Sequence, residues 1–134
     1  MKSTLQVGLA STKRILVDDD RCIGFMGKEG RVYATPQMVL DVEHACRDLL
    51  LEHLDEGEDS VGAHVSIDHL AATPSGLEVT IDIRIVEIEK RRVTFEFSVR
   101  DPIEECGRGK HVRFVADKAR SFERIKAKRA KAGL

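Results

Sequence analysis

The sequence of 134 residues contains no tryptophan and only one tyrosine, and it has no long hydrophobic run. Aromatic residues make up 4% of the chain, so few side chains are available to stack on the bases of single-stranded nucleic acid. No apolar run approaches the roughly 20 residues of a transmembrane helix, and the N-terminus lacks the apolar block of a secretory signal. We therefore expect no membrane partner and no nucleic-acid partner.

Cysteine is also scarce, with Cys22, Cys46 and Cys106 far apart in the chain. An odd and scattered set excludes a disulfide framework and any closely spaced cysteine metal site. His44 and His53 have no second set of ligands at metal-binding spacing, so no metal site is expected. Unpaired cysteines are typical of a reducing compartment, which predicts a cytoplasmic protein.

Hydrophobic residues make up 42% of the chain and charged residues 34%, a balance typical of a soluble globular domain. The length is that of one domain, and we find no internal repeat and no Pro/Gly/Ser-rich linker. We therefore expect a single domain over residues 1–134, with a core from about residue 5 to residue 116 and a basic C-terminal helix over 117–134.

The net charge of −1 hides an asymmetry. From Asp117 to the end there are seven basic and two acidic side chains, which gives this tail a charge of +5 and leaves −6 for residues 1–116. Such a tail is either a solvated helix or a contact for phosphates on nucleic acid, lipid or a nucleotide-bearing cofactor. The negative charge of the remaining chain argues against a nucleic-acid-binding module.

Hydrophobic periodicity predicts one long helix and several strands. Thr35-Pro36 opens the helix, with Thr35 as the N-cap and Pro36 just inside, and the apolar spacing continues to about Leu54. Residues 5–17 form a first strand, and alternating segments over 61–71, 77–88, 93–99 and around 112–114 form four more. After Ile85 the alternation changes phase, which predicts a bulge or a bend.

Short turns join the last four strands, so they pair as an antiparallel sheet. A helix of about 20 residues is about 30 Å long, comparable with these strands, so the sheet can curl around it. This predicts an α+β fold, an antiparallel sheet curled around one long central helix, with a second helix at the C-terminus. One helix covers only one face of the sheet, and a homodimer would complete the structure.

Three side chains are candidates for chemistry, and each has an ordinary structural alternative. His69 is in phase with Val65 and Ile67, so it points toward the helix, either as a functional group or as a core histidine. Glu43 lies at the margin of the helix's apolar stripe, where partial removal from water suits a carboxylate to proton transfer, or it simply faces solvent. Thr35 either only caps the helix or stands where free backbone N–H groups can hold a developing oxyanion.

Other residues are weaker candidates. Gly107-Arg108-Gly109 is too short for a phosphate-binding fingerprint. His111 and Arg113 share one face of the last strand, opposite Phe114, where they either line the mouth of a pocket or face water. Cys46 lies on the apolar stripe of the helix and is expected in the core.

Several segments together resemble a known family. They are Val32-Tyr33-Ala34-Thr35, Met38-Val39, Glu43-His44-Ala45-Cys46, Gly62 and His69-Leu70-Ala71-Ala72-Thr73-Pro74-Ser75-Gly76. With their spacing, they resemble the hotdog-fold thioesterases related to fluoroacetyl-CoA thioesterase, over roughly residues 30–116. The resemblance implies a homodimer with the hotdog fold and an active site at the subunit interface. It also implies hydrolysis of an acyl-CoA without a metal or other cofactor, since CoA is part of the substrate.

The resemblance also assigns residues. Thr35, Glu43 and His69 match the family's catalytic Thr, Glu and His, and Gly62 and Arg113 match a glycine near the thioester and an arginine of the last strand. Glu43 would be the base or the nucleophile, Thr35 a nucleophile or a water-positioning hydroxyl, and His69 a donor to the oxyanion or to the leaving thiolate. Because Thr35 and Glu43 are about 12 Å apart along one helix, we expect them to meet through the substrate or the other subunit.

The segment before the helix differs from the aromatic lid of the fluoroacetyl-specific enzyme. Phe25 and Met26 are its only large apolar residues, among charges and glycines, and we expect these two to contact the substrate. A dry pocket reserved for a fluorinated acyl group is therefore not expected. The expected substrate carries either an ordinary short or medium acyl group or the acyl group of a dedicated pathway. The alternative is a hotdog protein that binds acyl-CoA or a related ligand without turnover, while a dehydratase on this fold lacks supporting residues.

Overall fold

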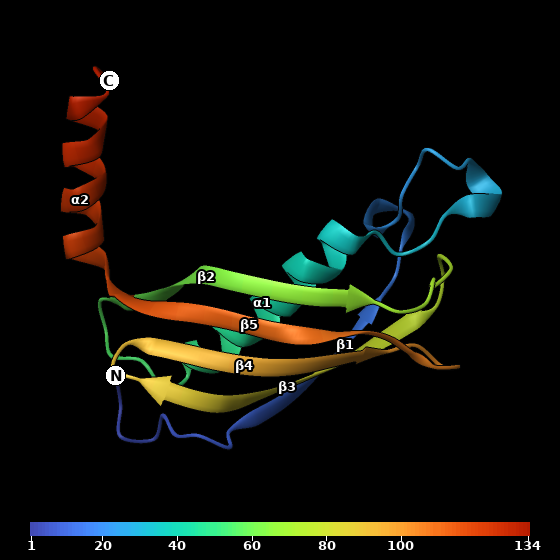
Figure 1. Ribbon diagram of the computed structural model, residues 1–134, viewed down its shortest axis with the longest axis horizontal. Helices are drawn as coiled ribbons and strands as arrows, with labels where there is room; N and C mark the ends of the chain where they lie inside the picture. The colour runs from blue at the N-terminus through green and yellow to red at the C-terminus, as the bar shows by residue number, and fades with distance from the viewer.

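The computed structural model describes residues 1–134 and contains one five-stranded antiparallel sheet and two α-helices (Figure 1). In chain order the elements are β1 (Ala10–Leu16), two short 3-10 turns (Asp19–Arg21 and Lys28–Gly30), α1 (Thr35–Leu51), β2 (Glu58–His69), β3 (Glu78–Glu89), β4 (Arg92–Arg100), β5 (Glu105–Asp117) and α2 (Lys118–Lys131). The strands lie in the order β1-β3-β4-β5-β2. This confirms the predicted order of one strand, a loop, a long helix and four strands. No helix is long and apolar enough to cross a membrane.

The apolar stripe of α1 is buried against the sheet, as its spacing predicts. The stripe comprises Met38, Val42, Ala45, Cys46 and Leu49. It joins apolar side chains of β3 and β4 in a core of 19 residues. Burial raises the pKa of the Cys46 thiol to about 12, because the thiolate loses its solvation. Cys46 is therefore a neutral core residue, as predicted.

The start of α1 differs from the prediction. The prediction that Thr35 caps the helix is wrong, because the N-cap is Ala34 and no side chain closes this end. Thr35 is the first helical residue, and Pro36 follows it. Proline has no backbone N–H and therefore suits the first turn of a helix, where N–H groups lack partners. The Thr35 hydroxyl instead faces His69, which leaves the backbone N–H groups at the helix start without a side-chain cap.

The first strand is shorter than predicted, covering residues 10–16 rather than 5–17. Leu5 and Leu9 still pack against the core, but the chain between them turns rather than extending. Gly8 lies there with φ at +98°, a left-handed conformation that favours glycine. Apolar content alone therefore overestimated the length of this strand.

The sheet has three register shifts, at Gly62/His64, Ile85/Glu87 and Val99/Arg100, and the first two bear on the sequence predictions. The predicted phase change after Ile85 is confirmed by a register shift between Ile85 and Glu87. A second, unpredicted shift lies between Gly62 and His64, so that Val61 pairs with Phe114 whereas Val65 pairs with His111. Val61 and Val65 therefore lie on different faces of β2, although they alternate in phase in the sequence.

Strand β2 has a free edge. It pairs only with β5, and residues 61–66 are all exposed. Ser60 to Ile67 contains no Lys, Arg, Asp or Glu, although exposed edge strands usually carry charges that prevent pairing with another chain. Helix α2 projects from the sheet at one end of β2, and the loop that contains Phe25 projects at the other (Figure 1). The free edge therefore lies in a recess between two projecting segments.

Candidate active site

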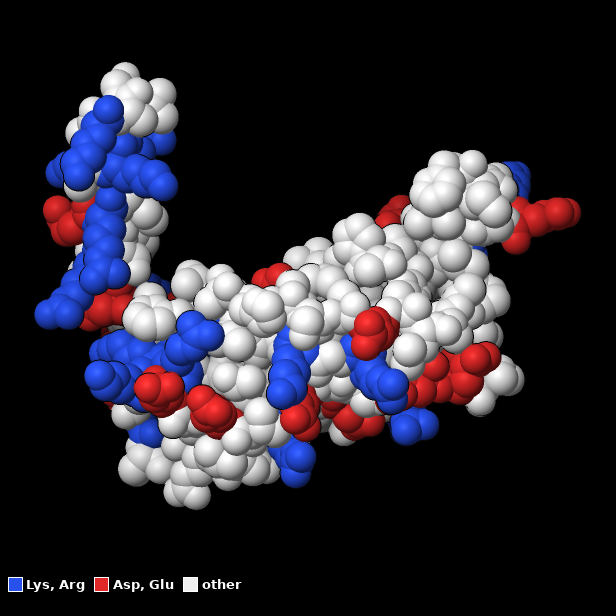
Figure 2. Space-filling model, viewed as in Figure 1, with Lys and Arg blue, Asp and Glu red and all other residues white.

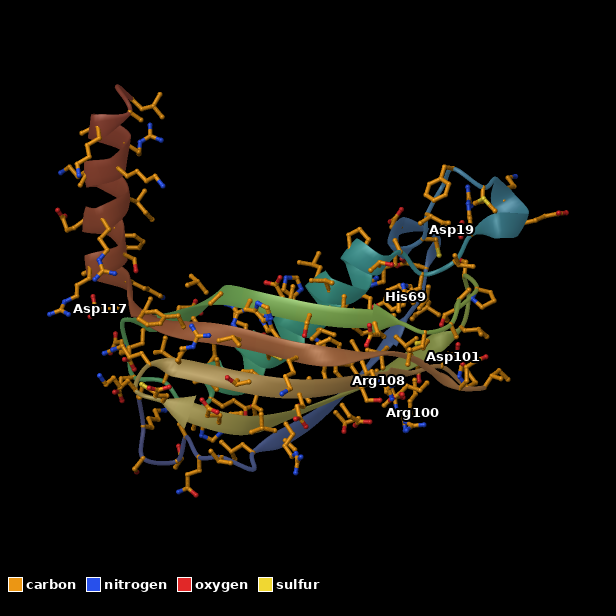
Figure 3. The ribbon with its side chains drawn as sticks, in the orientation of Figure 1. Asp19, His69, Arg100, Asp101, Arg108 and Asp117 are labelled. Atoms are coloured by element: carbon orange, nitrogen blue, oxygen red, sulfur yellow. The ribbon has the colours of Figure 1, made fainter.

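Thr35 and His69 form a pair at the C-terminal end of β2. The Thr35 Oγ1 lies 2.6 Å from His69 Nδ1. Thr35 comes from the first turn of α1 and His69 from the last residue of β2, where Figure 3 labels it. A surface cavity of about 370 Å³ lies beside them, lined by Val32, Thr35, His69, Leu70, Ala71 and Ala72. A hydroxyl beside an imidazole in a cavity is an arrangement that can activate or orient a nucleophile.

The environment of His69 favours the neutral form of its imidazole. Burial lowers the pKa of His69 below its ordinary value, against a smaller opposing effect of the Ala71 backbone, because the charged ring loses solvation. Its Nε2 is buried and has no hydrogen-bond partner in the chain, which is rare for a buried polar atom. When Nδ1 accepts the Thr35 hydroxyl proton, a neutral ring carries its own proton on Nε2. That N–H is then a donor without an acceptor, available to an oxygen atom outside this chain.

Glu43, Gly62 and Arg113 form a second group further along α1 and β2. The Glu43 Oε2 lies 3.6 Å from Arg113 Nη1. A Cβ atom on residue 62 would lie 3.1 Å from Glu43 Oε2, tighter than ordinary contact, so a glycine leaves room beside the carboxylate. A cavity of about 310 Å³ lies here, lined by Glu43, Gly62, Ala63, His64, Val65 and His111. The carboxylate is thus accessible and held by a single cation.

The Arg113 guanidinium is itself fixed in place. It is 4% exposed and donates to the Ser60 hydroxyl at 2.7 Å and the Ser60 carbonyl at 2.8 Å. It also contacts His111 Nε2 at 3.1 Å. Since a guanidinium only donates, His111 Nε2 must accept, and His111 Nδ1–H donates to the His64 carbonyl at 2.9 Å. Of the two alternatives for His111 and Arg113, facing water is wrong, because both side chains are buried. His111 lines the cavity beside Glu43, and Arg113 does not.

His111 and His69 predict a pH dependence of stability. Burial lowers the pKa of His111, and the adjacent Arg113 cation lowers it further, against the opposing hydrogen bond to His64. Both histidines therefore stay neutral in the folded chain at a pH where the unfolded chain, with pKa values of about 6.5, takes up protons. The unfolded state then binds more protons, so stability should fall as pH decreases below about 6.5.

Urea unfolding at several pH values would measure this effect. As the pH falls below about 6.5, His111→Gln should reduce the slope of unfolding free energy against pH. His44→Gln, at an exposed position on α1, serves as the control. An unchanged slope in His111→Gln would show that His111 does not titrate differently in the folded chain.

Within one chain the two groups are separated. Thr35 and Glu43 are eight residues apart on α1, about 12 Å, and Gly62 and His69 are seven apart on β2, about 23 Å. Thr35 contacts His69 and Glu43 contacts Arg113, so the structure shows no direct Thr35–Glu43 bond, as expected. The groups lie at two positions along the same free edge.

Phe25 and Met26, predicted to contact substrate, line neither cavity. They are 83% and 65% exposed, in the loop that projects beyond the start of α1. The structure contains no group of three or more His, Cys, Asp or Glu side chains arranged to hold a metal ion.

Sequence reasoning missed the residues that hold the site in place. Ser60 fixes Arg113, and the buried Asp41 accepts hydrogen bonds from Tyr33 and Arg21. The two hydrogen bonds to Asp41 connect the loop before α1 to the helix, about two turns after its first residue. A signal was available for Asp41, because a carboxylate next to Val42 on the buried face of a helix needs partners. None was available for Ser60, whose role depends on the pairing of β2 with β5.

Comparison with known proteins places this geometry in a family. Residues 17–119 match the family of fluoroacetyl-CoA-specific thioesterases (FlK). The chain belongs to this family. The fluoroacetyl-CoA thioesterase of Streptantibioticus cattleyicolor is 33% identical over 122 residues, covering 86% of this chain and 88% of the relative.

Solved structures show the same fold. The fluoroacetyl-CoA thioesterase FlK superimposes with a TM-score of 0.85 at 29% identity, covering 94% of this chain and 98% of the other. A Thermus thermophilus member of the thioesterase superfamily gives 0.83 at 26% identity, with coverages of 97% and 98%. A hot-dog-like protein from Thermanaerovibrio acidaminovorans gives 0.85 at 21% identity, covering 91% of each chain, and supports the fold alone. The predicted hotdog fold and the predicted enzyme class, a thioesterase, are thereby confirmed.

Proposed function

We propose that this FlK-family thioesterase hydrolyses a short or medium acyl-CoA to the free acid and CoA, at a site completed between two copies of the chain. The observation that carries the proposal is the division of the predicted catalytic residues into two groups along one free edge, which is uncharged from Ser60 to Ile67. His69 has a buried Nε2 without a partner, and Glu43 opens into a separate cavity. The Thr35–His69 group offers a hydrogen-bond donor but no carboxylate, and the Glu43 group offers the carboxylate.

A homodimer would bring the groups together. If two β2 edges pair antiparallel so that Gly62 faces His69 of the second copy, the two-fold axis passes through Ser66, because Ala63 is the extra residue of the bulge. That axis lies within the uncharged, exposed stretch of β2. The pairing places Glu43 of one copy near Thr35 and His69 of the other, in two equivalent sites. It also removes the free edge, which is a hazard for a lone chain.

The chemistry of the proposed site follows from these groups. The Nε2–H of His69 and the free backbone N–H groups at the start of α1 bind the thioester carbonyl oxygen as it becomes negative. Glu43, oriented by Arg113, takes a proton from water, whose oxygen forms a bond with the carbonyl carbon. The C–S bond then breaks, and the proton passes to the leaving CoA thiolate. Thr35 holds the His69 ring and positions the water.

The acyl group should be an ordinary one. Phe25 and Met26 are exposed in the single chain, so we propose that they contact the acyl group only once a second copy covers the loop. A lid of two apolar residues among charges is not the dry enclosure that a fluoroacetyl-specific site requires. The reaction as proposed uses water and side chains without a cofactor. The three free cysteines support a cytoplasmic location.

Release of free thiol from a panel of acyl-CoAs of increasing chain length tests the proposed function. Hydrolysis that is fastest for short or medium chains would support it, and the order of rates would size the acyl pocket. If a folded, dimeric sample releases no thiol from any member but binds acyl-CoA, the protein is the alternative, a hotdog protein that binds without turnover.

A charge at the proposed two-fold axis should abolish both the dimer and the activity. Ser66→Lys brings two cations together at the axis, where like charges oppose pairing. We expect a monomer by size-exclusion chromatography with light scattering, and loss of most thiol release. Thr12→Lys places the same charge on β1, the other edge strand, and should remain dimeric. A dimeric and active Ser66→Lys variant would rule out this interface.

A further inference from the structure

A third cavity lies at the base of α2, away from the groups described above. Its volume is about 420 Å³, within the range of small-molecule sites. It is lined by Arg91, Phe114, Val115, Ala116, Asp117, Arg120, Ser121 and Arg124. These residues come from the turn between β3 and β4, the end of β5 and the first two turns of α2. Asp117 marks this junction in Figure 3, at the opposite end of the sheet from His69.

The cavity is rich in cations. Arg120 and Arg124 are four residues apart on α2 and so lie on one helix face, and neither forms an ion pair in the chain. Arg91 is already engaged, donating to Glu58 at 3.1 Å and to the Val115 carbonyl. The one carboxylate in the lining, Asp117, accepts from the Arg120 backbone N–H as the helix cap. Figure 2 shows Lys and Arg side chains gathered over this end of the sheet and along α2.

An aromatic ring lies among these cations. Phe114 is 41% exposed, and it lines both this cavity and a neighbouring one of about 330 Å³, formed with residues 89–92. The ring therefore presents apolar surface between two hollows bordered by Arg91 and Arg92. An exposed aromatic face next to unpaired guanidinium groups is suited to a ligand that carries both a flat base and phosphates.

We propose that this cavity binds the nucleotide end of CoA, with the adenine against Phe114 and the phosphates on Arg120 and Arg124. The inference rests on the proposed function. Along the sheet the two sites are close, because β5 carries both Arg113, which holds Glu43, and Asp117, and the four steps between them span about 13 Å. The pantetheine arm of CoA is about as long as four extended residues, roughly 14 Å.

The arm also has a route between the two sites. Arg113 and Phe114 are adjacent residues of β5 and face opposite sides of the sheet, so the arm must pass around its edge. The proposed pairing of β2 with a second copy leaves Glu58 to Ser60 beyond the end of the partner strand. This uncovered start of β2 lies beside the end of β5, since Asp59 pairs with Ala116. The arm can therefore pass from the cavity to Glu43 without crossing the dimer interface.

The double variant Arg120→Ala/Arg124→Ala tests the assignment when acyl-CoA is compared with the acyl-pantetheine that lacks the nucleotide. Loss of two charge-assisted contacts should raise KM for acyl-CoA at least about tenfold, while KM for acyl-pantetheine stays at its wild-type value. The control Lys128→Ala/Lys131→Ala removes the same charge from α2 beyond the cavity and should leave both values unchanged. The proposal is overturned if both double variants raise KM for acyl-CoA equally. It is also overturned if Arg120→Ala/Arg124→Ala raises KM equally for acyl-CoA and acyl-pantetheine.

Calorimetric binding of 3′-phosphoadenosine 5′-diphosphate separates this inference from the proposed function. Binding by the wild type that is lost in Arg120→Ala/Arg124→Ala supports the nucleotide site even if no thioester is hydrolysed. Hydrolysis of acyl-CoA with no binding of this probe would overturn the site and leave the proposed function standing. Steeply salt-dependent binding of duplex DNA that is lost in the same variant, with KM for acyl-CoA unchanged, would assign α2 to nucleic acid instead.

Discussion

Replacing Glu43 by Gln is expected to lower kcat for thioester hydrolysis by about 10²–10⁴-fold, the range typical of losing a positioned general base. The substitution keeps the shape of the side chain but removes its ability to accept a proton from water. Glu43 is only partly buried and contacts Arg113 at the edge of ion-pair distance, so the fold should tolerate an amide there. The measurement is thiol release at saturating acyl-CoA, with the oligomeric state of variant and wild type compared by light scattering.

Glu52→Gln is a matched control for this experiment. Glu52 follows the last residue of α1 and is exposed, so its replacement makes the same change in charge on the same helix. It should retain wild-type turnover. Near-normal turnover in Glu43→Gln would remove Glu43 from the mechanism, and loss of turnover in both variants would indicate a general effect of charge on α1.

Replacing His69 by Ala is expected to lower kcat by about 10²–10³-fold, with a smaller change in KM, the loss found when a donor to an oxyanion is removed. The physical reason is the buried Nε2, which has no partner in the chain and would donate only to an oxygen that gains charge in the transition state. If KM rises strongly while kcat persists, His69 is a binding residue rather than a catalytic one.

Two further variants sharpen this test. His53 contacts Thr4 at 2.8 Å, a second His–Thr pair away from the site, so His53→Ala should leave turnover unchanged. Thr35→Ala combined with His69→Ala should cost little more than His69→Ala alone, because the two side chains act as one hydrogen-bonded unit. Additive losses would show that Thr35 has a role independent of the ring, such as that of a nucleophile.

Local patterns were reliable wherever one element's own periodicity decided the outcome. The apolar stripe from Met38 to Leu49 is buried as its helical spacing requires. The change of phase at Ile85 predicted a bulge or a bend, and the register shift is there. The spacing of Thr35, Glu43 and His69 indicated the thioesterase family to which the chain belongs.

Predictions that needed a partner from elsewhere in the chain were less successful. Thr35 was expected to cap α1, but its hydroxyl pairs with a residue 34 positions away. The bulge at Gly62 breaks a regular alternation of apolar residues and depends on how β2 meets β5. Arg113 was identified as a site residue, yet its fixation by Ser60 follows from the same pairing.

The sequence by itself determined the elements, their order, the buried face of α1 and the side chains available for chemistry. Those properties follow from repeats of 3.6 and 2 residues and from the chemistry of single side chains. Only the tertiary structure decided that Thr35 meets His69, that Arg113 holds Glu43, and that Arg120 and Arg124 approach Phe114 beside one cavity. These contacts join residues distant in the chain, and a shift of one residue in strand pairing would turn each side chain to the opposite face.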